Sequence, residues 1–152
     1  MDVLDLIKRD HAEVKSLFDQ FQALGQGNEA QRAGVAKKIL EQLPAHDHSE
    51  ESAVYSPTRD RVEDNSDRAK VAEAFEEHQA ASKLVKELKS LSQSDKKFTA
   101  MMNELIAAVR KHIEDEEGKV HPLVRECFDD AERERMGKQF EEGKQRELAR
   151  SA

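Results

Sequence analysis

The chain is poor in the residues that stabilise small folds or break helices. Its 152 residues include one cysteine, three prolines, six glycines, one tyrosine and no tryptophan. A single cysteine, Cys127, excludes an internal disulfide framework and a four-cysteine zinc site, and it fits a reducing, cytoplasmic setting. Scarce glycine and proline favour long helices with short connections.

Two further absences exclude classes of function. No run of about 18 apolar residues exists, so no membrane span is expected, and the start MDVLDLIKRDHAEV lacks the apolar core of a secretory signal. The net charge is −7, which argues against a protein that grips nucleic acid through a broad basic face. We therefore expect neither a membrane nor a nucleic acid as partner.

The apolar periodicity predicts four long helices, at about residues 2–23, 29–54, 67–91 and 95–117. Residues 25–28 should end the first helix, and residues 58–66 should form a loop. Pro44 should kink or bulge the second helix, Ser56-Pro57-Thr58 should close it, and Gly118 should end the fourth. The predicted fold is an all-α, up-down four-helix bundle over residues 1–122, followed by a peripheral, partly mobile charged helix over 123–152.

Ionisable residues interrupt the apolar seams of these helices. The first seam runs through positions 4, 7, 11, 14, 18 and 21, and its third member is His11. The other seams carry His46, Glu50, His78, His112 and Glu116. Burying each one unpaired would cost several kcal/mol, while a whole domain is stable by roughly 5–15 kcal/mol. They must therefore share a partner.

The two halves of the chain repeat this pattern. His11 precedes His46 by 35 residues, and His78 precedes His112 by 34. His46 and His112 each begin the pattern H-x-x-x-E-E, and Val54-Tyr55 aligns with Val120-His121. Two similar helical hairpins predict a bundle with approximate two-fold symmetry.

The spacing indicates a metal site. Residues four apart lie on one helix face, so each HxxxE pair can bind from one helix while His11 and His78 bind from the other two. Four imidazoles and two carboxylates are too many for tetrahedral zinc, and they suit iron or manganese, with the carboxylates bridging two ions. The alternative is a hydrogen-bonded polar core without metal, which the matched spacings disfavour.

The pattern H…HxxxE…H…HxxxE resembles the hemerythrin-like, or HHE cation-binding, family over roughly residues 1–122. The resemblance implies two iron ions, cycling between Fe2+ and Fe3+ and joined by an oxo or hydroxo bridge. The oxygen carriers of the family have a second histidine four residues after the one in the third helix, where this chain has Ser82. Their last carboxylate is an aspartate at the position of Glu117. One coordination position is thus left for water, peroxide or another side chain.

Two side chains are candidates for that position, Tyr55 and His121. On an ideal helix Tyr55 points about 180° away from His46 and reaches the metals only if the helix bulges; it is also the best candidate for moving protons. Glu117 is either an additional ligand, a partner of a ligand imidazole or solvated. Glu51 is expected to be solvated and His48 to lie on the surface.

The resemblance to bacterial members implies a protein that reacts with peroxide or oxygen, with a catalase-like or oxidative-stress role. The alternative is a non-enzymatic sensor, carrier or store for O2, NO or iron. A bundle that has lost its metal is a third reading. Small ligands such as O2, H2O2 or NO are the expected partners, and the chain is expected to be a monomer or weak homodimer.

Overall fold

The computed structural model describes residues 1–25 and 27–151, and within them the chain is helical and contains no strand. Two of its segments, η1 and η2, are single π-helical turns. The elements in chain order are α1 (Val3–Ala23), α2 (Glu29–Glu50), η1 (Glu51–Tyr55), α3 (Ser56–Arg61), α4 (Asn65–Ser90), α5 (Lys96–Asp115), η2 (Glu116–Val120), α6 (His121–Cys127) and α7 (Asp130–Ser151).

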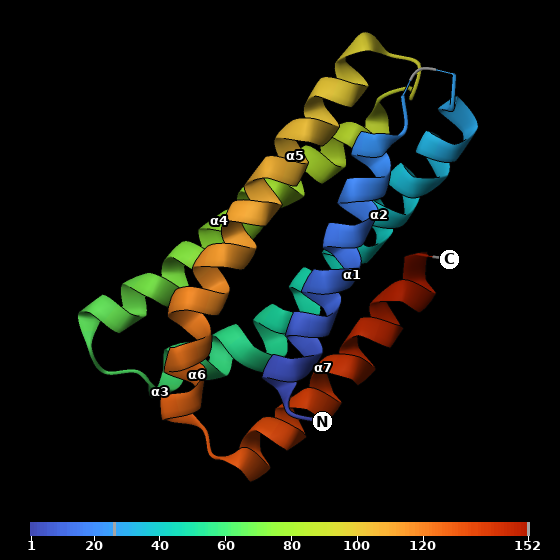
Figure 1. The fold of residues 1–152 in the computed structure, drawn as a ribbon. Helices are drawn as coiled ribbons and strands as arrows, with labels where there is room; N and C mark the ends of the chain where they lie inside the picture. The colour runs from blue at the N-terminus through green and yellow to red at the C-terminus, as the bar shows by residue number, and fades with distance from the viewer. Residues whose placement is uncertain (26, 152) are drawn as a thin grey trace.

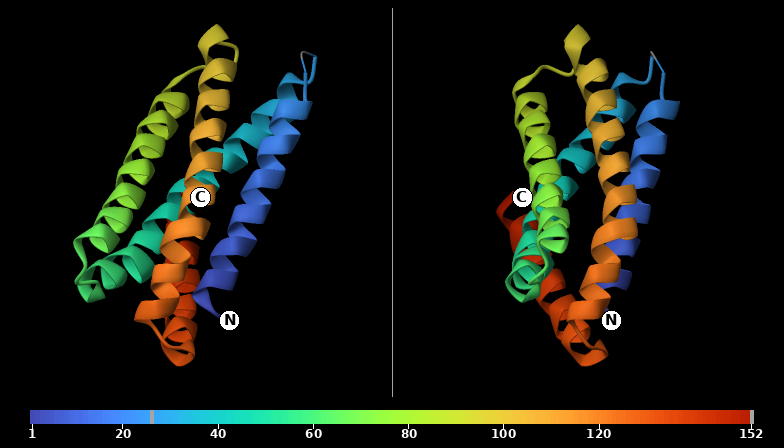
Figure 2. Two further views of the ribbon diagram at one scale, coloured as in Figure 1. Left: turned by 60° about the vertical axis from the view of Figure 1, so that its left-hand side comes forward. Right: turned by 90° about the vertical axis from the view of Figure 1, so that its left-hand side faces the viewer.

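Helices α1, α2, α4 and α5 form an up-down four-helix bundle (Figure 1). Helix α1 packs beside α2, and α4 packs beside α5, as the two predicted hairpins require. Helix α7 lies along α2 and α1 on the outside of the bundle, and the three views of Figures 1 and 2 agree on this placement. The predicted all-α bundle is confirmed.

Aspartates begin three of the long helices. Asp2, Asp64 and Asp95 each accept a hydrogen bond from a backbone N–H of the first turn, at 2.9, 3.1 and 2.8 Å. Such caps satisfy donors that have no partner within the helix. Helix α1 ends at Ala23, and Gly27 follows with φ +94°, a left-handed conformation that favours glycine. The predicted break at 25–28 therefore falls where expected, although Gln26 lies outside the described residues.

Two expectations about helix ends were wrong. Helix α2 contains Pro44 and runs on to Glu50, where the π turn η1 follows. The helical path continues past Ser56 to Arg61, so the predicted loop at 58–66 is confined to residues 62–64. It also continues past Gly118 to Cys127. Pro57 and Pro122 lie at the second positions of α3 and α6, directly after the two π turns, and the helical path continues through both.

The core is divided into two apolar clusters. One fills the end of the bundle at α3 and α6 and includes Leu6, Val71 and Val124, and the other fills the far end with residues such as Phe18, Leu88 and Met102. The second cluster is built largely from residues that the helical periodicity predicted to face inward, whereas the first also contains residues outside the predicted seams, such as Leu6 and Val124. The ionisable seam residues are buried as well.

Helix α7 shares the first of these clusters. Phe140 is fully buried there, with Met136 beside it. A Cβ at Gly137 would collide with the backbone oxygen of Met1, so glycine permits the close approach of α7 to the start of α1. The sequence, with its few apolar residues beyond Pro122, gave little sign of this packing. No helix in the described part of the chain is long and apolar enough to cross a membrane.

Candidate metal centre

The two π turns decide which side chains face the interior. In each, an N–H bonds to the carbonyl five residues earlier: Ser56 to Glu51, and His121 to Glu116. A π turn holds one residue more than an α turn, so positions i and i+5 lie where i and i+4 normally would. Glu50 and Tyr55 therefore share a face, as do Glu116 and His121. The bulge that Tyr55 needed to reach the site is present.

Four buried histidines form two pairs at the centre of the bundle. His11 of α1 lies beside His46 of α2, with ring centroids 5.3 Å apart. His78 of α4 lies beside His112 of α5, with centroids 4.6 Å apart. Each hairpin of the sequence repeat thus supplies one pair.

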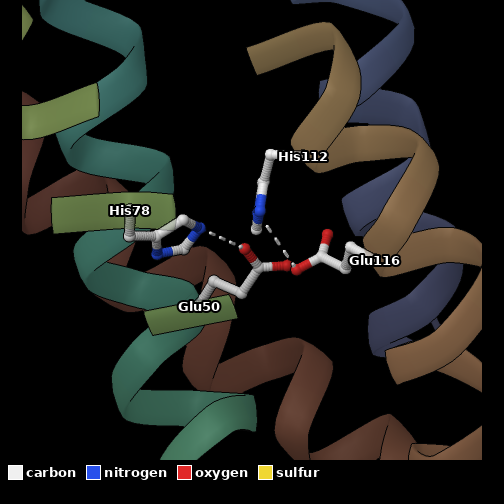
Figure 3. Close-up of side chains that lie close together, drawn as sticks. All are labelled: Glu50, His78, His112 and Glu116. Atoms are coloured by element: carbon white, nitrogen blue, oxygen red, sulfur yellow. Dashed lines mark ion pairs between the residues drawn. The ribbon is translucent and has the colours of Figure 1, made fainter. Parts of the chain in front are cut away.

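Two fully buried glutamates connect the pairs. Glu50 Oε1 lies 3.4 Å from Nε2 of His46 and 3.3 Å from Nε2 of His78. Glu116 Oε1 lies 3.1 Å from Nε2 of His11, and its Oε2 lies 3.7 Å from Nε2 of His112. Figure 3 shows Glu50 and Glu116 pointing toward each other between His78 and His112. Each carboxylate therefore touches both histidine pairs, which is the arrangement a bridging ligand needs.

Tyr55 and His121 reach opposite ends of the site. The Tyr55 hydroxyl lies 3.3 Å from Nε2 of His78 and 3.2 Å from Nε2 of His112, and it donates to Glu116. The His121 ring stacks on His11, with centroids 6.3 Å apart, and its Nε2 lies 3.7 Å from Glu116 Oε1. Each therefore contacts a histidine from the other half of the repeat.

Every histidine of the two pairs has a carboxylate at its outer ring nitrogen. The Nδ1 atoms of His11, His46, His78 and His112 lie 2.7, 2.9, 3.1 and 2.8 Å from oxygens of Glu117, Asp10, Glu51 and Glu77, respectively. A carboxylate at Nδ1 orients the ring and leaves Nε2 free to bind a metal.

This outer layer corrects the expectation for Glu51, which is not simply solvated because it contacts His78. Of the alternatives for Glu117, the structure shows contact with the imidazole of His11. No role was predicted for Asp10 or Glu77. Their signal was present in the repeat, since each directly precedes the first histidine of its half.

Three other residues complete the description. Oδ1 of Asp47 lies 3.4 Å from Nε2 of His78. Asp47 was not among the predicted site residues. His48 lies on the surface as predicted, with 58% of its side chain exposed, near Glu147. Ser82 is half-buried on α4, and His121, the first residue of α6, brings a fifth imidazole to the site.

The ionisable side chains of the site are buried, and burial and their neighbours shift their pKa values. Burial lowers the pKa of His46, but the charge of Glu50 and the hydrogen bond to Asp10 outweigh it and raise the pKa to about 10. Burial raises the pKa of Glu116, but the neighbouring imidazoles of His11 and His121 hold it well below its usual value. Burial and the charge of Glu116 raise the pKa of the Tyr55 phenol. The pKa values of His11, His46 and His78 are raised by the carboxylates around them, so without a cation protons on these imidazoles can balance the two glutamates.

Several buried polar atoms of the site lack a hydrogen-bond partner among the described residues. They are Nε2 of His46, both carboxylate oxygens of Glu50, Oε1 of Glu116 and both ring nitrogens of His121. Buried polar atoms without a partner are costly. Two groups of side chains that share Glu50 have ligand atoms close enough together to hold an ion: His11, His46 and Glu50, and Glu50, His78, His112 and Glu116. The chemistry of these donors, imidazole nitrogen and carboxylate oxygen, fits a metal cation.

The match to known families agrees with this geometry. The model of the hemerythrin HHE cation binding domain matches residues 2–124. The chain belongs to this family. A hemerythrin HHE cation binding domain-containing protein from Mycobacterium kansasii has the same fold, with a TM-score of 0.81, 19% identity, and coverage of 98% of this chain and 88% of that one.

The chain is also similar to part of a longer protein. A DNA nickase of Nostoc sp. strain PCC 7120 is 26% identical over 145 residues, which cover 95% of this chain. Those residues make up 39% of the nickase, so the chain spans well under half of that protein. The family is one of cation-binding domains, and the buried histidine and glutamate cluster fits a metal site.

Proposed function

We propose that this protein is a non-heme di-iron protein that reacts with peroxide or oxygen. One ion would be held by His11, His46 and His121, and the other by His78, His112 and Tyr55, with Glu50 and Glu116 shared. The observation that carries the proposal is that each buried glutamate touches histidines of both pairs. Mixed nitrogen and oxygen ligation favours iron over tetrahedral zinc.

When bound, the iron pair supplies reversible one-electron redox chemistry at two adjacent ions. The residues of the chain then control what reaches it. The outer carboxylates fix the orientation of the four imidazoles, and an apolar cluster packs on each side of the site. Until it binds an ion, the Tyr55 hydroxyl holds a proton beside Glu116, so it is the group best placed to donate or accept one.

The test combines metal content with reactivity. Purified protein should contain two irons per chain, show near-ultraviolet charge-transfer absorption and convert hydrogen peroxide to oxygen and water. His112→Ala should lose that activity, while the exposed control Lys97→Ala should keep it. A wild-type protein with two irons that consumes no peroxide contradicts the enzymatic role.

A reversible spectral change on adding oxygen or nitric oxide to the reduced protein, without turnover, would instead indicate a sensor or carrier. The likeness to a DNA nickase adds no nucleic-acid function to the proposal, because it covers 39% of that protein and this chain carries a net charge of −7.

A further inference from the structure

A cavity of about 440 Å³ adjoins the metal centre on the side of the second apolar cluster. His11, His46 and His112, three of the buried histidines, line it. Its lining also includes the exposed residues Glu13 and Lys38, so it connects the surface to the site between α1 and α2.

Apolar side chains from three helices line the cavity: Val14 and Leu17 of α1, Leu43 of α2, and Val109 and Ile113 of α5. Polar side chains such as Asp10 and Gln42 line it as well. A lining that combines apolar side chains with convergent polar groups is typical of sites for small organic molecules.

The volume of the cavity also fits a small organic molecule. A water molecule takes about 30 Å³ of liquid volume, so oxygen or hydrogen peroxide would fill a small fraction of 440 Å³. Cavities that bind organic ligands run from roughly 300 to 1,000 Å³. The cavity is therefore large enough for an alkyl chain whose polar end meets the histidines.

We infer that this cavity binds the alkyl chain of an organic hydroperoxide, and that such hydroperoxides are the substrate class of the site. The inference rests on the proposed function. In the reaction the O–O bond of R–OOH breaks and takes up two protons and two electrons, giving an alcohol R–OH and water. The two electrons would come from the iron pair in its ferrous state, and two molecules of an added thiol would restore that state, giving a disulfide and the two protons.

Binding can be tested apart from reactivity. The probe is 1-octanol, which has the chain and a terminal oxygen but no O–O bond, titrated into the iron-loaded protein by calorimetry. Leu17, half-buried at the cavity wall, would be changed to Trp to fill the cavity. The matched control is Leu84→Trp, because Leu84 is equally half-buried in the same apolar cluster but lies outside the cavity lining.

Wild type and Leu84→Trp should bind 1-octanol, and Leu17→Trp should bind it roughly tenfold or more weakly. Consumption of hexyl hydroperoxide should fall by a similar factor in Leu17→Trp, while consumption of hydrogen peroxide changes little. If Leu17→Trp unfolds, the milder Leu17→Phe serves, since it should show the same selectivity to a smaller degree.

Absence of 1-octanol binding to wild type, or an equal loss of both peroxide activities in the folded Leu17 variant, overturns the inference. Binding of 1-octanol that Leu17→Trp weakens, in an iron-loaded protein that consumes no peroxide of either kind, overturns the proposed function and leaves the binding site standing.

Discussion

The two halves of the repeat follow the same backbone path but bring different side chains to the metal centre. In the first, His46 and Glu50 are followed by a π turn that brings in Tyr55; in the second, His112 and Glu116 are followed by a π turn that brings in His121. One end of the site thus receives a phenol and the other an imidazole. The comparison teaches that the repeat builds a symmetric scaffold, while the residue five positions after each glutamate gives the two ends of the site different side chains.

The outer carboxylates differ between the halves as well. Asp10, the partner of His46, is buried and also accepts a hydrogen bond from Lys144 of α7 at 2.9 Å. Glu77, the partner of His112, is 19% exposed, and its nearby cation, Lys111, is 70% exposed. The first half is therefore held by an additional helix that has no counterpart in the second.

The largest loss of iron is expected on changing Glu50, which contacts histidines of both halves. Glu50→Gln removes the charge that both histidine pairs share, so bound iron should fall from two per chain to nearly none. Inductively coupled plasma mass spectrometry measures this. The exposed control Glu104→Gln should keep its iron, and a Glu50→Gln protein with full iron content would contradict the bridging role.

The next prediction separates the two ends of the site. If the Tyr55 phenol is a ligand to ferric iron, Tyr55→Phe should abolish a visible phenolate-to-iron band while most of the iron stays bound. His121→Gln should leave that band in place. Absorption spectra of both variants decide the matter, and a band that survives in Tyr55→Phe would remove Tyr55 from the ligand set.

A smaller effect is expected from the outer carboxylates. Loss of such a partner typically lowers metal affinity by about 10–100-fold. Asp10→Asn should reach the upper part of that range and Glu77→Gln the lower, because Asp10 is buried and held by Lys144. Competition with a chelator measures both affinities. Equal losses would show that α7 gives the first half no special support.

The smallest effect concerns the metal-free protein and pH. Because the pKa of His46 is raised to about 10 in the folded state, its contribution to stability is complete below the unfolded pKa of about 6.5. That contribution is lost as the pH rises toward 10. The Tm of the metal-free protein should therefore fall across this range, and less steeply in His46→Gln. A flat profile in the wild type would show that the imidazole carries no such charge.

The sequence predicted the bundle because its periodicity is regular and its caps are local. It also selected the six seam residues, since histidine and glutamate at apolar positions stand out. The sequence did not predict the π turns η1 and η2. An ideal α-helix turns Tyr55 away from His46, and nothing in the local pattern indicates an extra residue in the turn. The packing of α7 depends on contacts distant in sequence, such as that of Gly137 with Met1, which periodicity does not show.

The central claim is that one buried site holds two irons in unequal surroundings. Mössbauer spectroscopy of the oxidised protein, loaded with isotopically enriched iron, tests it most directly. The account predicts two ferric signals of equal area with different parameters, one for the end at Tyr55 and one for the end at His121. A single signal, or one iron per chain, would contradict it.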